Sequence, residues 1–396
     1  MPPPVASLPQ EVVRTEKMAA GGNAIAHLID GRVVFVEGAL PDEAVRVAIH
    51  TSKRDFARAA VVEIVGPSVH RVTAPCPELA RGCGGCGWQH AAPAAQVQWK
   101  AEIVADALRR TAQLPEAVVE LGGSVGPWAY RTSMRLAVAP DGRVGLREGS
   151  SHRVVPLASC MVAHPSLAEL LPGMRVAGGD EVSLRVSAAT GEATAWAATP
   201  RTRIDGLPAH VKLGRSEALH EHVLGVPLRV TAGSFFQSGP AAAELLVATV
   251  RVACADLLAD LREPLLDAYG GIGLFAATLG PAHSFVVESS ASACADAVAN
   301  LGDRATVFHT PFERWAPQPV RLAVVDPARV GVGREAAGVL AATGAERIVL
   351  VSCDPVSLAR DTVLLAEHGY RHAGSTVLDL FPHTPHVEVV TRFDRA

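Results

Sequence analysis

The sequence lacks any long apolar segment, because no run of about 18 apolar residues free of charge occurs along the chain. This absence predicts that no helix crosses a membrane. The N-terminus, MPPPVASLPQ, also lacks the basic start and apolar core of a secretory signal, and it predicts a short flexible leader. We therefore expect a cytoplasmic protein, in which the seven cysteines stay reduced and need an explanation other than disulfides.

A positive net charge is lacking as well. The formal net charge is −4, whereas nucleic-acid-binding proteins usually show a basic surface or a high pI. One local basic group is opposed only by Asp55, and it fits a solvated strand face at least as well as a nucleic-acid site; its members are Arg46, Lys53, Arg54 and Arg58. Charged residues are few, at 19%, against 49% hydrophobic residues. This composition excludes disorder and allows two or three domains.

Three regions follow a leader at residues 1–9, and together they predict an α/β protein. Residues 10–70 alternate apolar and polar positions between turn signals, which predicts short strands closing into a small OB-like β-barrel. Residues 71–235 mix both patterns and predict a central α+β domain. Residues 236–396 alternate strands with helices, which predicts a doubly wound, mostly parallel sheet of the Rossmann type. Helices are expected over residues 96–111, 166–171 and 242–258.

A glycine-rich turn, Asp-Ala-Tyr-Gly-Gly-Ile-Gly at residues 267–273, ends an apolar strand and precedes a helix. Glycines there let the backbone approach a ligand closely. Glu288 ends the next strand, where a carboxylate binds ribose hydroxyls in nucleoside sites. The full G-x-G-x-x-G phosphate motif is missing, because Phe275 and Ala276 follow Leu274. A nucleoside without phosphates, such as S-adenosylmethionine, therefore fits better than a nicotinamide dinucleotide, and tight packing is the third interpretation.

Two later strands end in chemically active residues. Asp326 follows the apolar run AVV, and Cys353 follows VLVS. Ligands of doubly wound sheets bind outside the carboxyl ends of the strands, so both side chains are expected at the crevice of the glycine turn. A lone cysteine is more often an inert buried residue, but a strand-end loop before Asp-Pro favours function. Glu388 adds a carboxylate in a Pro/His-rich loop before the last strand.

Four of the seven cysteines are placed like metal ligands. Three stand in CPELARGCGGC and one in LASCMVAHP; they are Cys76, Cys83, Cys86 and Cys160. Four thiolates hold either zinc or an iron–sulfur cluster. Three close cysteines in a glycine-rich loop favour a metal site, although their spacing does not separate the two metals. By contrast, Cys254 and Cys294 lie in helical segments and are expected to be ordinary buried residues.

Six segments, in this order and spacing, resemble the RNA 5-methyluridine (uracil-C5) methyltransferases. They are SFFQ ending at Gln237, DAYGGIG at 267–273, VVE ending at Glu288, DPAR starting at Asp326, VSCDP with LARD after Cys353, and FPHTPHVE ending at Glu388. The segment GGNAIAHLIDGRVVFVEGALPDE also resembles the small RNA-binding TRAM barrel of this family, and WAYRTSMRLAV resembles part of its central domain. The resemblance therefore spans nearly the whole chain.

The resemblance implies a class I methyltransferase domain that methylates C5 of a uridine in RNA with S-adenosylmethionine. It makes Cys353 the nucleophile that adds to C6, and Glu388 the base that removes the C5 proton. It places Asp326 and Gln237 at the cofactor or the base edge. The residues expected at the cofactor are Gln237, Tyr269, Gly271, Gly273, Leu274, Glu288 and Asp326.

A few positions concern the flipped-out target base or depart from the family pattern. Phe235 or Phe236 is a candidate to stack on the uracil, or both are core aromatics. Leu274 stands where many members have a polar Asn at the methionine end of the cofactor, and Pro311 where an Asn or Asp often meets the adenine. Asp354 replaces the more usual Asn after the catalytic cysteine.

Members that act on ribosomal RNA carry a [4Fe–4S] cluster on a nearly identical cysteine motif. The resemblance thus implies this cluster, with zinc as the alternative, and it favours 23S rRNA as the partner of a monomer without membrane contact. Two alternatives are the same chemistry on tRNA and a catalytically silent RNA-binding protein, against which Cys353 and Glu388 argue. A nicotinamide-dependent oxidoreductase is disfavoured by the missing phosphate motif.

Overall fold

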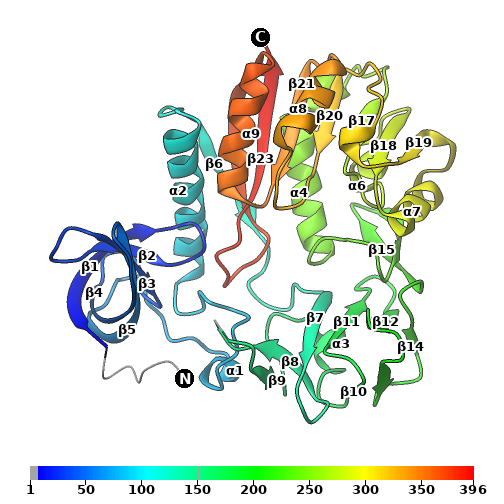
Figure 1. Cartoon of the computed structure of the whole chain (residues 1–396). Helices are drawn as coiled ribbons and strands as arrows, with labels where there is room; N and C mark the ends of the chain where they lie inside the picture. The colour runs from blue at the N-terminus through cyan, green and yellow to red at the C-terminus, as the bar shows by residue number, and fades with distance from the viewer. Residues whose placement is uncertain (1–7, 150) are drawn as a thin grey trace.

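The computed structural model describes residues 8–149 and 151–396, arranged as a barrel, a central region and a C-terminal sheet (Figure 1). The leader expected over residues 1–9 lies outside the described residues as far as residue 7. Across the described ranges, no helix is long and apolar enough to cross a bilayer. The predicted α/β class with an N-terminal barrel is confirmed.

The N-terminal barrel forms because its strands alternate buried and exposed positions, so that closing the sheet buries one face. Its strands, in closed order, are β1 (Gln10–Met18), β2 (Ala24–His27), β3 (Val33–Glu37), β5 (Phe56–Gly66) and β4 (Ala44–Ser52). Trp88 and Trp99 from the following segment pack on the barrel core. On its surface Arg46 pairs with Glu63 at 3.0 Å, so the basic group has a second opposing acid besides Asp55.

The central region is built around a six-stranded sheet that packs on a short helix, α3 (Pro165–Ala168). In spatial order the strands are β14 (Val211–Leu213), β12 (Ala193–Trp196), β11 (Glu181–Val186), β7 (Ser133–Val138), β8 (Val144–Arg147) and β9 (Val154–Pro156). Two small antiparallel sheets accompany it: β10 (Arg175–Ala177) pairs with β13 (Arg203–Asp205), and β15 (Ala218–Val223) forms a hairpin with β16 (Val226–Thr231). Helix α1 (Pro77–Ala80) lies in the cysteine-rich loop that precedes it.

The C-terminal sheet has eight strands and is parallel except for β23. In spatial order they are β19 (Ala305–His309), β18 (Ser284–Glu288), β17 (Leu265–Ala268), β20 (Leu322–Val325), β21 (Arg347–Ser352), β23 (Glu388–Arg395), β22 (Tyr370–Asp379) and β6 (Val119–Ser124). Both faces are buried: Val349 and Val351 of β21 join one core, and Ile348 and Leu350 join the other. This two-sided burial explains why the strands read as continuous apolar runs.

Helices cover both faces of this sheet. One core contains α4 (Pro240–Ala253), α6 (Leu274–Thr278) and α7 (Ala291–Leu301), and the other contains α2 (Pro93–Thr111), α8 (Gly333–Ala342) and α9 (Pro355–Glu367). Two 3-10 turns, η2 (Gly302–Arg304) and η3 (Phe312–Arg314), complete the connections. The arrangement is the predicted doubly wound Rossmann-type sheet, which is confirmed.

The structure differs from the sequence predictions in three elements. The helix expected over residues 242–258 breaks at Cys254, where φ is −126°, into α4 and the short α5 (Ala255–Leu258). The helix expected over residues 166–171 is only the four-residue α3. Strand β6, which the sequence places within the central region, instead pairs in parallel with β22, and α2 packs on α9 and β22. Pairing between distant strands leaves no local sequence pattern.

Candidate active site

Cys353 and Glu388 lie close together at the ends of two adjacent strands. The antiparallel pairing of β21 with β23 runs from Arg347 opposite Asp394 to Ser352 opposite Val389. Cys353 follows the last residue of β21, and Glu388 is the first residue of β23, so the two residues lie at adjoining strand ends. The carboxyl of Glu388 is close enough to act on the Cys353 thiol. The register therefore brings together two residues that lie far apart in the sequence.

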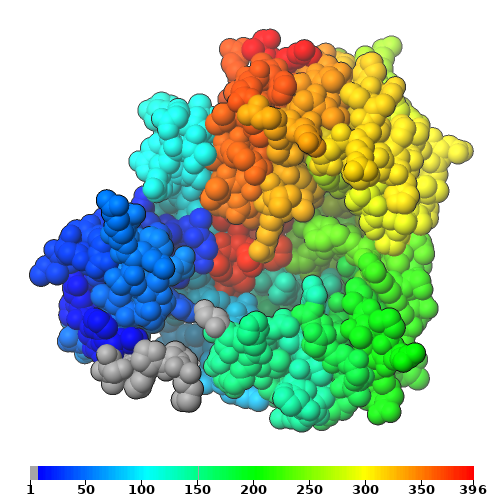
Figure 2. All heavy atoms as spheres, in the orientation of Figure 1, coloured from blue at the N-terminus to red at the C-terminus, as the bar shows by residue number. Residues whose placement is uncertain are grey.

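The loop that precedes Glu388 reaches the middle of the molecule. It joins β22 to β23 and descends from the C-terminal sheet toward the barrel and the central region (Figure 1). In the space-filling view this C-terminal segment, coloured red, is visible at the surface where the three parts meet (Figure 2). A macromolecular substrate that reaches this end of β23 can therefore also contact the barrel and the central region.

The surroundings of Cys353 disfavour its thiolate in the free protein. Burial raises the pKa of the thiol to about 11, and the neighbouring carboxyls of Glu388 and Asp326 act in the same direction. Arg329 opposes them and lowers this pKa. Glu388 is 5% exposed, and burial, together with the charge of Asp326, raises its pKa well above the ordinary value. Glu388 is thus suited to hold a proton in one state and to accept one in another.

Asp326 lies beside this pair at the carboxyl end of β20, as the sequence predicts. Its backbone N–H donates to the carbonyl of Ala268 at 3.2 Å, which joins the ends of β20 and β17. Burial raises the pKa of its carboxyl group above the ordinary value. Asp326 also lines the adjoining pocket at the glycine turn, so it connects the cysteine to that pocket.

A pocket at the glycine turn collects most of the residues expected at the cofactor. Five of the seven line it: Gln237, Tyr269, Gly271, Leu274 and Asp326. Glu288 lies next to it, where its carboxylate accepts hydrogen bonds from the backbone N–H of Gly271 at 3.0 Å and of Ser290 at 2.6 Å. The acid therefore faces the turn from the neighbouring strand end, which is the arrangement of a ribose-binding carboxylate.

Gly273 has a different position from the one expected. It has a φ of 80° and caps α6, and a Cβ atom there would lie 2.7 Å from Leu301 Cδ1 on α7. Gly273 does not line the pocket in the part of the chain that the structure describes. A glycine is required at this position because the backbone is left-handed and the helices pack closely. Gly273 therefore supports the shape of the turn next to the pocket.

Two buried or charged residues near the site were missed by the sequence reasoning. Asp267, at the end of β17, is fully buried; its Oδ2 accepts from the N–H of Ala276 at 3.0 Å, and burial raises its pKa to about 8. Arg329 acts on Cys353 and Glu388, and its Nη2 lies 3.4 Å from His386 Nδ1. Asp267 begins the DAYGGIG segment and Arg329 ends the DPAR segment, and this position within the recognised segments could have identified them.

The residues that depart from the family pattern keep plausible local roles. Asp354 caps α9, since its side chain accepts from the N–H of Ser357 at 2.7 Å. Pro311 follows Thr310, whose N–H donates to the carbonyl of Glu288 at 2.9 Å, so it stays next to the glycine-turn pocket. Phe235 is 70% exposed and Phe236 is 8% exposed, although both line this pocket. Phe235 is therefore the aromatic residue available to an incoming base.

The four predicted metal ligands converge on one cavity between the glycine-rich loop and the central sheet. Its lining includes Cys76, Cys83, Cys86 and Cys160. Burial raises the pKa of Cys86 to about 11 and raises those of Cys83 and Cys160. All seven cysteines are free. Among the residues that the structure describes, no group of three or more His, Cys, Asp or Glu side chains is arranged to hold a metal ion.

Glu78 fastens the two segments that carry these cysteines. Its side chain is nearly buried, and its Oε1 accepts hydrogen bonds from the backbone N–H groups of Ala158 at 3.1 Å and Ser159 at 3.3 Å. This contact holds Cys160 beside the glycine-rich loop. The four thiols that line this cavity are donors of the kind that iron–sulfur clusters and zinc take, but in this structure they are not arranged around a metal ion.

Comparisons with known proteins identify relatives of the barrel and of nearly the whole chain. A family model for the TRAM domain matches residues 13–62, which lie in the barrel. An uncharacterized RNA methyltransferase of Streptomyces coelicolor is 36% identical over 97% of this chain and 92% of its own length. The 23S rRNA (uracil(1939)-C(5))-methyltransferase RlmD of Methylococcus capsulatus is 34% identical over 98% of each chain.

A solved structure shows a similar fold. The tRNA (uracil-54, C5)-methyltransferase of Pyrococcus abyssi, in complex with S-adenosyl-L-homocysteine, superposes with a TM-score of 0.71. The match covers 96% of this chain and 99% of that one, at 23% identity. At this identity the likeness shows that the fold is shared along nearly the whole chain.

Proposed function

The chain belongs to the RNA uracil-C5 methyltransferases, and from this premise we propose that it transfers a methyl group from S-adenosylmethionine to C5 of a uridine in 23S rRNA. The observation that supports the proposal is the pairing of β21 with β23, after which Cys353 and Glu388 follow at adjoining strand ends, with Asp326 between them and the glycine-turn pocket. The choice of 23S rRNA rests on several relatives named RlmD, which are 32–34% identical to this chain.

Cys353 begins the reaction, because C5 of uracil is too weak a nucleophile to attack a methyl sulfonium directly. Addition of the thiolate to C6 breaks the C5–C6 double bond and leaves an enolate that is nucleophilic at C5. Arg329 supports this step, since its positive charge favours the thiolate of Cys353. Methyl transfer to C5 then leaves a saturated adduct that still carries the original C5 proton.

Glu388 completes the cycle by accepting this proton. The electron pair of the C5–H bond re-forms the C5–C6 double bond, and the Cys353 sulfur leaves as thiolate. A buried carboxylate with a raised pKa is a stronger base than an exposed one, so the position of Glu388 suits this task. The exposed ring of Phe235 is available to stack on the flipped-out uracil.

The glycine-turn pocket is the proposed place of S-adenosylmethionine, which supplies the electrophilic methyl group when bound. Glu288 would bind the ribose hydroxyls, and Asp326 and Gln237 would hold the methionine end toward Cys353. Leu274 offers an apolar side chain where a polar residue is common in the family. The backbone of the turn therefore has to provide the polar contacts there.

The rate should rise with pH because addition to C6 needs the Cys353 thiolate, whereas Glu388 acts only after the methyl transfer. The pKa of Cys353 is raised to about 11 and that of Glu388 is raised as well. We expect kcat/KM to increase about tenfold per unit between about pH 6.5 and 9. Arg329→Met should move the profile to higher pH, because Arg329 lowers the pKa of Cys353. A flat profile would rule out a protonated Cys353 as the resting state.

We further propose that Cys76, Cys83, Cys86 and Cys160 hold a [4Fe–4S] cluster. The family resemblance selects the cluster, and the shared cavity of four thiols supports it. Anaerobically purified protein should be brown and contain about four iron atoms and four sulfides per chain. Cys86→Ser should lose most of the iron, whereas the matched change Cys254→Ser, at a buried cysteine outside this cavity, should keep it. Colourless protein with stoichiometric zinc would replace the cluster by zinc.

The proposed function is tested by incubating the purified protein with labelled S-adenosylmethionine and either 23S rRNA or total tRNA. Label should appear in 23S rRNA as 5-methyluridine at one position. Labelling of tRNA alone would show that the chemistry is right and the RNA wrong. The absence of label from uridines in both RNAs would refute the proposal.

A further inference from the structure

One charged pair is buried inside the protein and has no part in the proposed reaction steps. Lys100 of α2 is 0% exposed, and its Nζ lies 2.6 Å from Oδ1 of Asp379, whose side chain is 2% exposed. The same Nζ donates to the carbonyl of Phe381 at 3.2 Å. Burying two charges costs free energy that their attraction seldom repays in full. A buried pair therefore calls for a reason other than stability.

A second side chain of α2 contacts the same loop. Gln96, one helical turn before Lys100, is fully buried, and residues four apart share one face of a helix. Its Oε1 accepts from the backbone N–H of His383 at 2.7 Å. Its Nε2 donates to the carbonyls of Trp88 at 3.1 Å and Ala91 at 2.8 Å. Helix α2 thus contacts the connection between β22 and β23 at two points, Asp379 and His383.

The loop needs such support because its backbone is strained. His383 has a φ of 67°, in the left-handed region that a residue with a Cβ atom rarely adopts. A strained residue persists where its surroundings hold it, and Gln96 contacts the N–H of this residue. The ring of His383 also stacks on Trp128, with centroids 4.2 Å apart. Contacts from α2 and the central region therefore impose the loop conformation.

This loop ends at Glu388, the residue proposed as the base. Asp379 is the last residue of β22, and Glu388 is the first of β23. Between them His386 lies 3.4 Å from Arg329, the guanidinium that acts on Cys353 and Glu388. A different backbone conformation of residues 379–387 would therefore move Glu388 and His386 relative to Cys353.

We propose that Lys100 and Gln96 are positioning residues that hold residues 379–387 in the conformation in which Glu388 lies beside Cys353. This inference rests on the proposed function. It assigns α2, which also packs against β1 of the barrel, to the catalytic machinery of the C-terminal sheet. Its consequence is specific: weakening these contacts slows removal of the C5 proton, while addition of Cys353 continues.

The first test is Lys100→Met, which keeps the length of the side chain and removes its charge. We expect kcat to fall about 10- to 100-fold, KM for RNA to change little, and the covalent protein–RNA adduct to accumulate. Because Lys100→Met leaves Asp379 buried and unpaired, the double variant Lys100→Met/Asp379→Leu is measured beside it. The double variant should fold and still accumulate adduct, since it lacks the contact that holds the loop.

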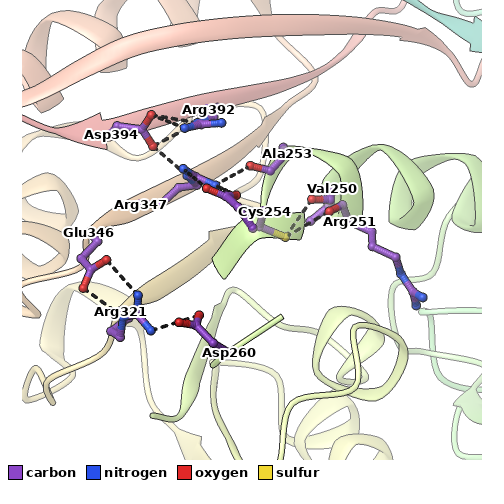
Figure 3. Close-up of polar contacts among 11 residues, drawn as sticks. Val250, Arg251, Ala253, Cys254, Asp260, Arg321, Glu346, Arg347, Arg392 and Asp394 are labelled. Atoms are coloured by element: carbon purple, nitrogen blue, oxygen red, sulfur yellow. Dashed lines mark hydrogen bonds and ion pairs between the residues drawn. The ribbon is translucent and has the colours of Figure 1, made fainter. Parts of the chain in front are cut away.

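The matched control is another buried cation, at the opposite end of the C-terminal sheet from the loop. Arg347 begins β21, at the end opposite Cys353, and its side chain is 6% exposed. It pairs with Asp394 at 2.7 Å (Figure 3) and with Asp256 at 3.0 Å. Arg347→Met should lower the melting temperature without accumulating adduct. Equal adduct levels in the Arg347 and Lys100 variants, or none in either, would overturn the inference.

A readout independent of activity separates this inference from the proposed function. Gln96→Met removes the acceptor of the His383 N–H, so hydrogen exchange across residues 379–387 should become at least about tenfold faster. Exchange in the barrel strands should stay unchanged. If Gln96→Met exchanges faster but the wild-type protein does not methylate RNA, the positioning role of Gln96 stands and the proposed reaction is refuted. If the wild-type protein is active but exchange in Gln96→Met is unchanged, only the positioning role is refuted.

Discussion

Replacing Cys353 by alanine is expected to lower methylation of RNA by about 10⁴-fold or more and to leave no covalent protein–RNA adduct. The Cys353 thiolate is the proposed group that adds to C6, and without that addition C5 does not become nucleophilic. The measurement is transfer of a labelled methyl group, combined with denaturing electrophoresis of the protein incubated with its RNA.

The control for this change is Cys254→Ser. Cys254 is fully buried at the end of α4, and its Sγ donates to the carbonyl of Val250 (Figure 3). A serine keeps that donor, so this variant should fold and retain its activity. If Cys353→Ala methylated RNA at a rate close to that of the Cys254 variant, the nucleophile would have to be another group and the mechanism would be wrong.

Glu388→Gln is expected to have the opposite effect on the adduct, which should accumulate to nearly one per active chain. Glutamine keeps the shape of the side chain and cannot accept the C5 proton, so Cys353 adds and the methyl group transfers, but elimination stalls. Multiple-turnover methylation should fall about 10²- to 10⁴-fold. The first methyl group should still reach the RNA, attached to the protein, in a single-turnover experiment.

The comparison for this variant is Glu367→Gln, which loses only a surface ion pair with Arg334 at 2.7 Å. It should turn over normally and form no stable adduct. Adding Cys353→Ala to Glu388→Gln should abolish the adduct. An adduct that survives in that double variant would come from a different residue and would contradict the proposed pairing of nucleophile and base.

Much of this protein was predictable because the relevant signals are local. Alternating strand and helix periodicities predicted the doubly wound sheet, and alternation within residues 10–70 predicted the barrel. The glycine turn at 267–273 and the strand ends at Asp326 and Cys353 followed from the rule that ligands bind at the carboxyl ends of parallel strands. Three of the four cysteines were grouped by their close spacing, Cys160 was added as the fourth thiolate, and all four line one cavity.

The sequence was a poorer guide wherever a residue's role depends on a distant partner. Gly273 was expected at the cofactor, and the structure adds a local reason for glycine there, namely its left-handed backbone and close approach to Leu301. Arg329 was overlooked because nothing near it in the sequence shows that its charge reaches Glu388. Strand β6 was placed with the central region, since its pairing with β22 involves residues some 250 positions away.

The sequence by itself determined which elements form and which strand ends carry reactive groups, because backbone periodicity and turn residues act over a few positions. Only the tertiary structure decided that Cys353 and Glu388 lie at adjoining strand ends, since strand register is set by how whole faces are buried. It alone also placed Lys100 against Asp379. Packing between distant segments brings such charges together, and no local pattern of residues encodes it.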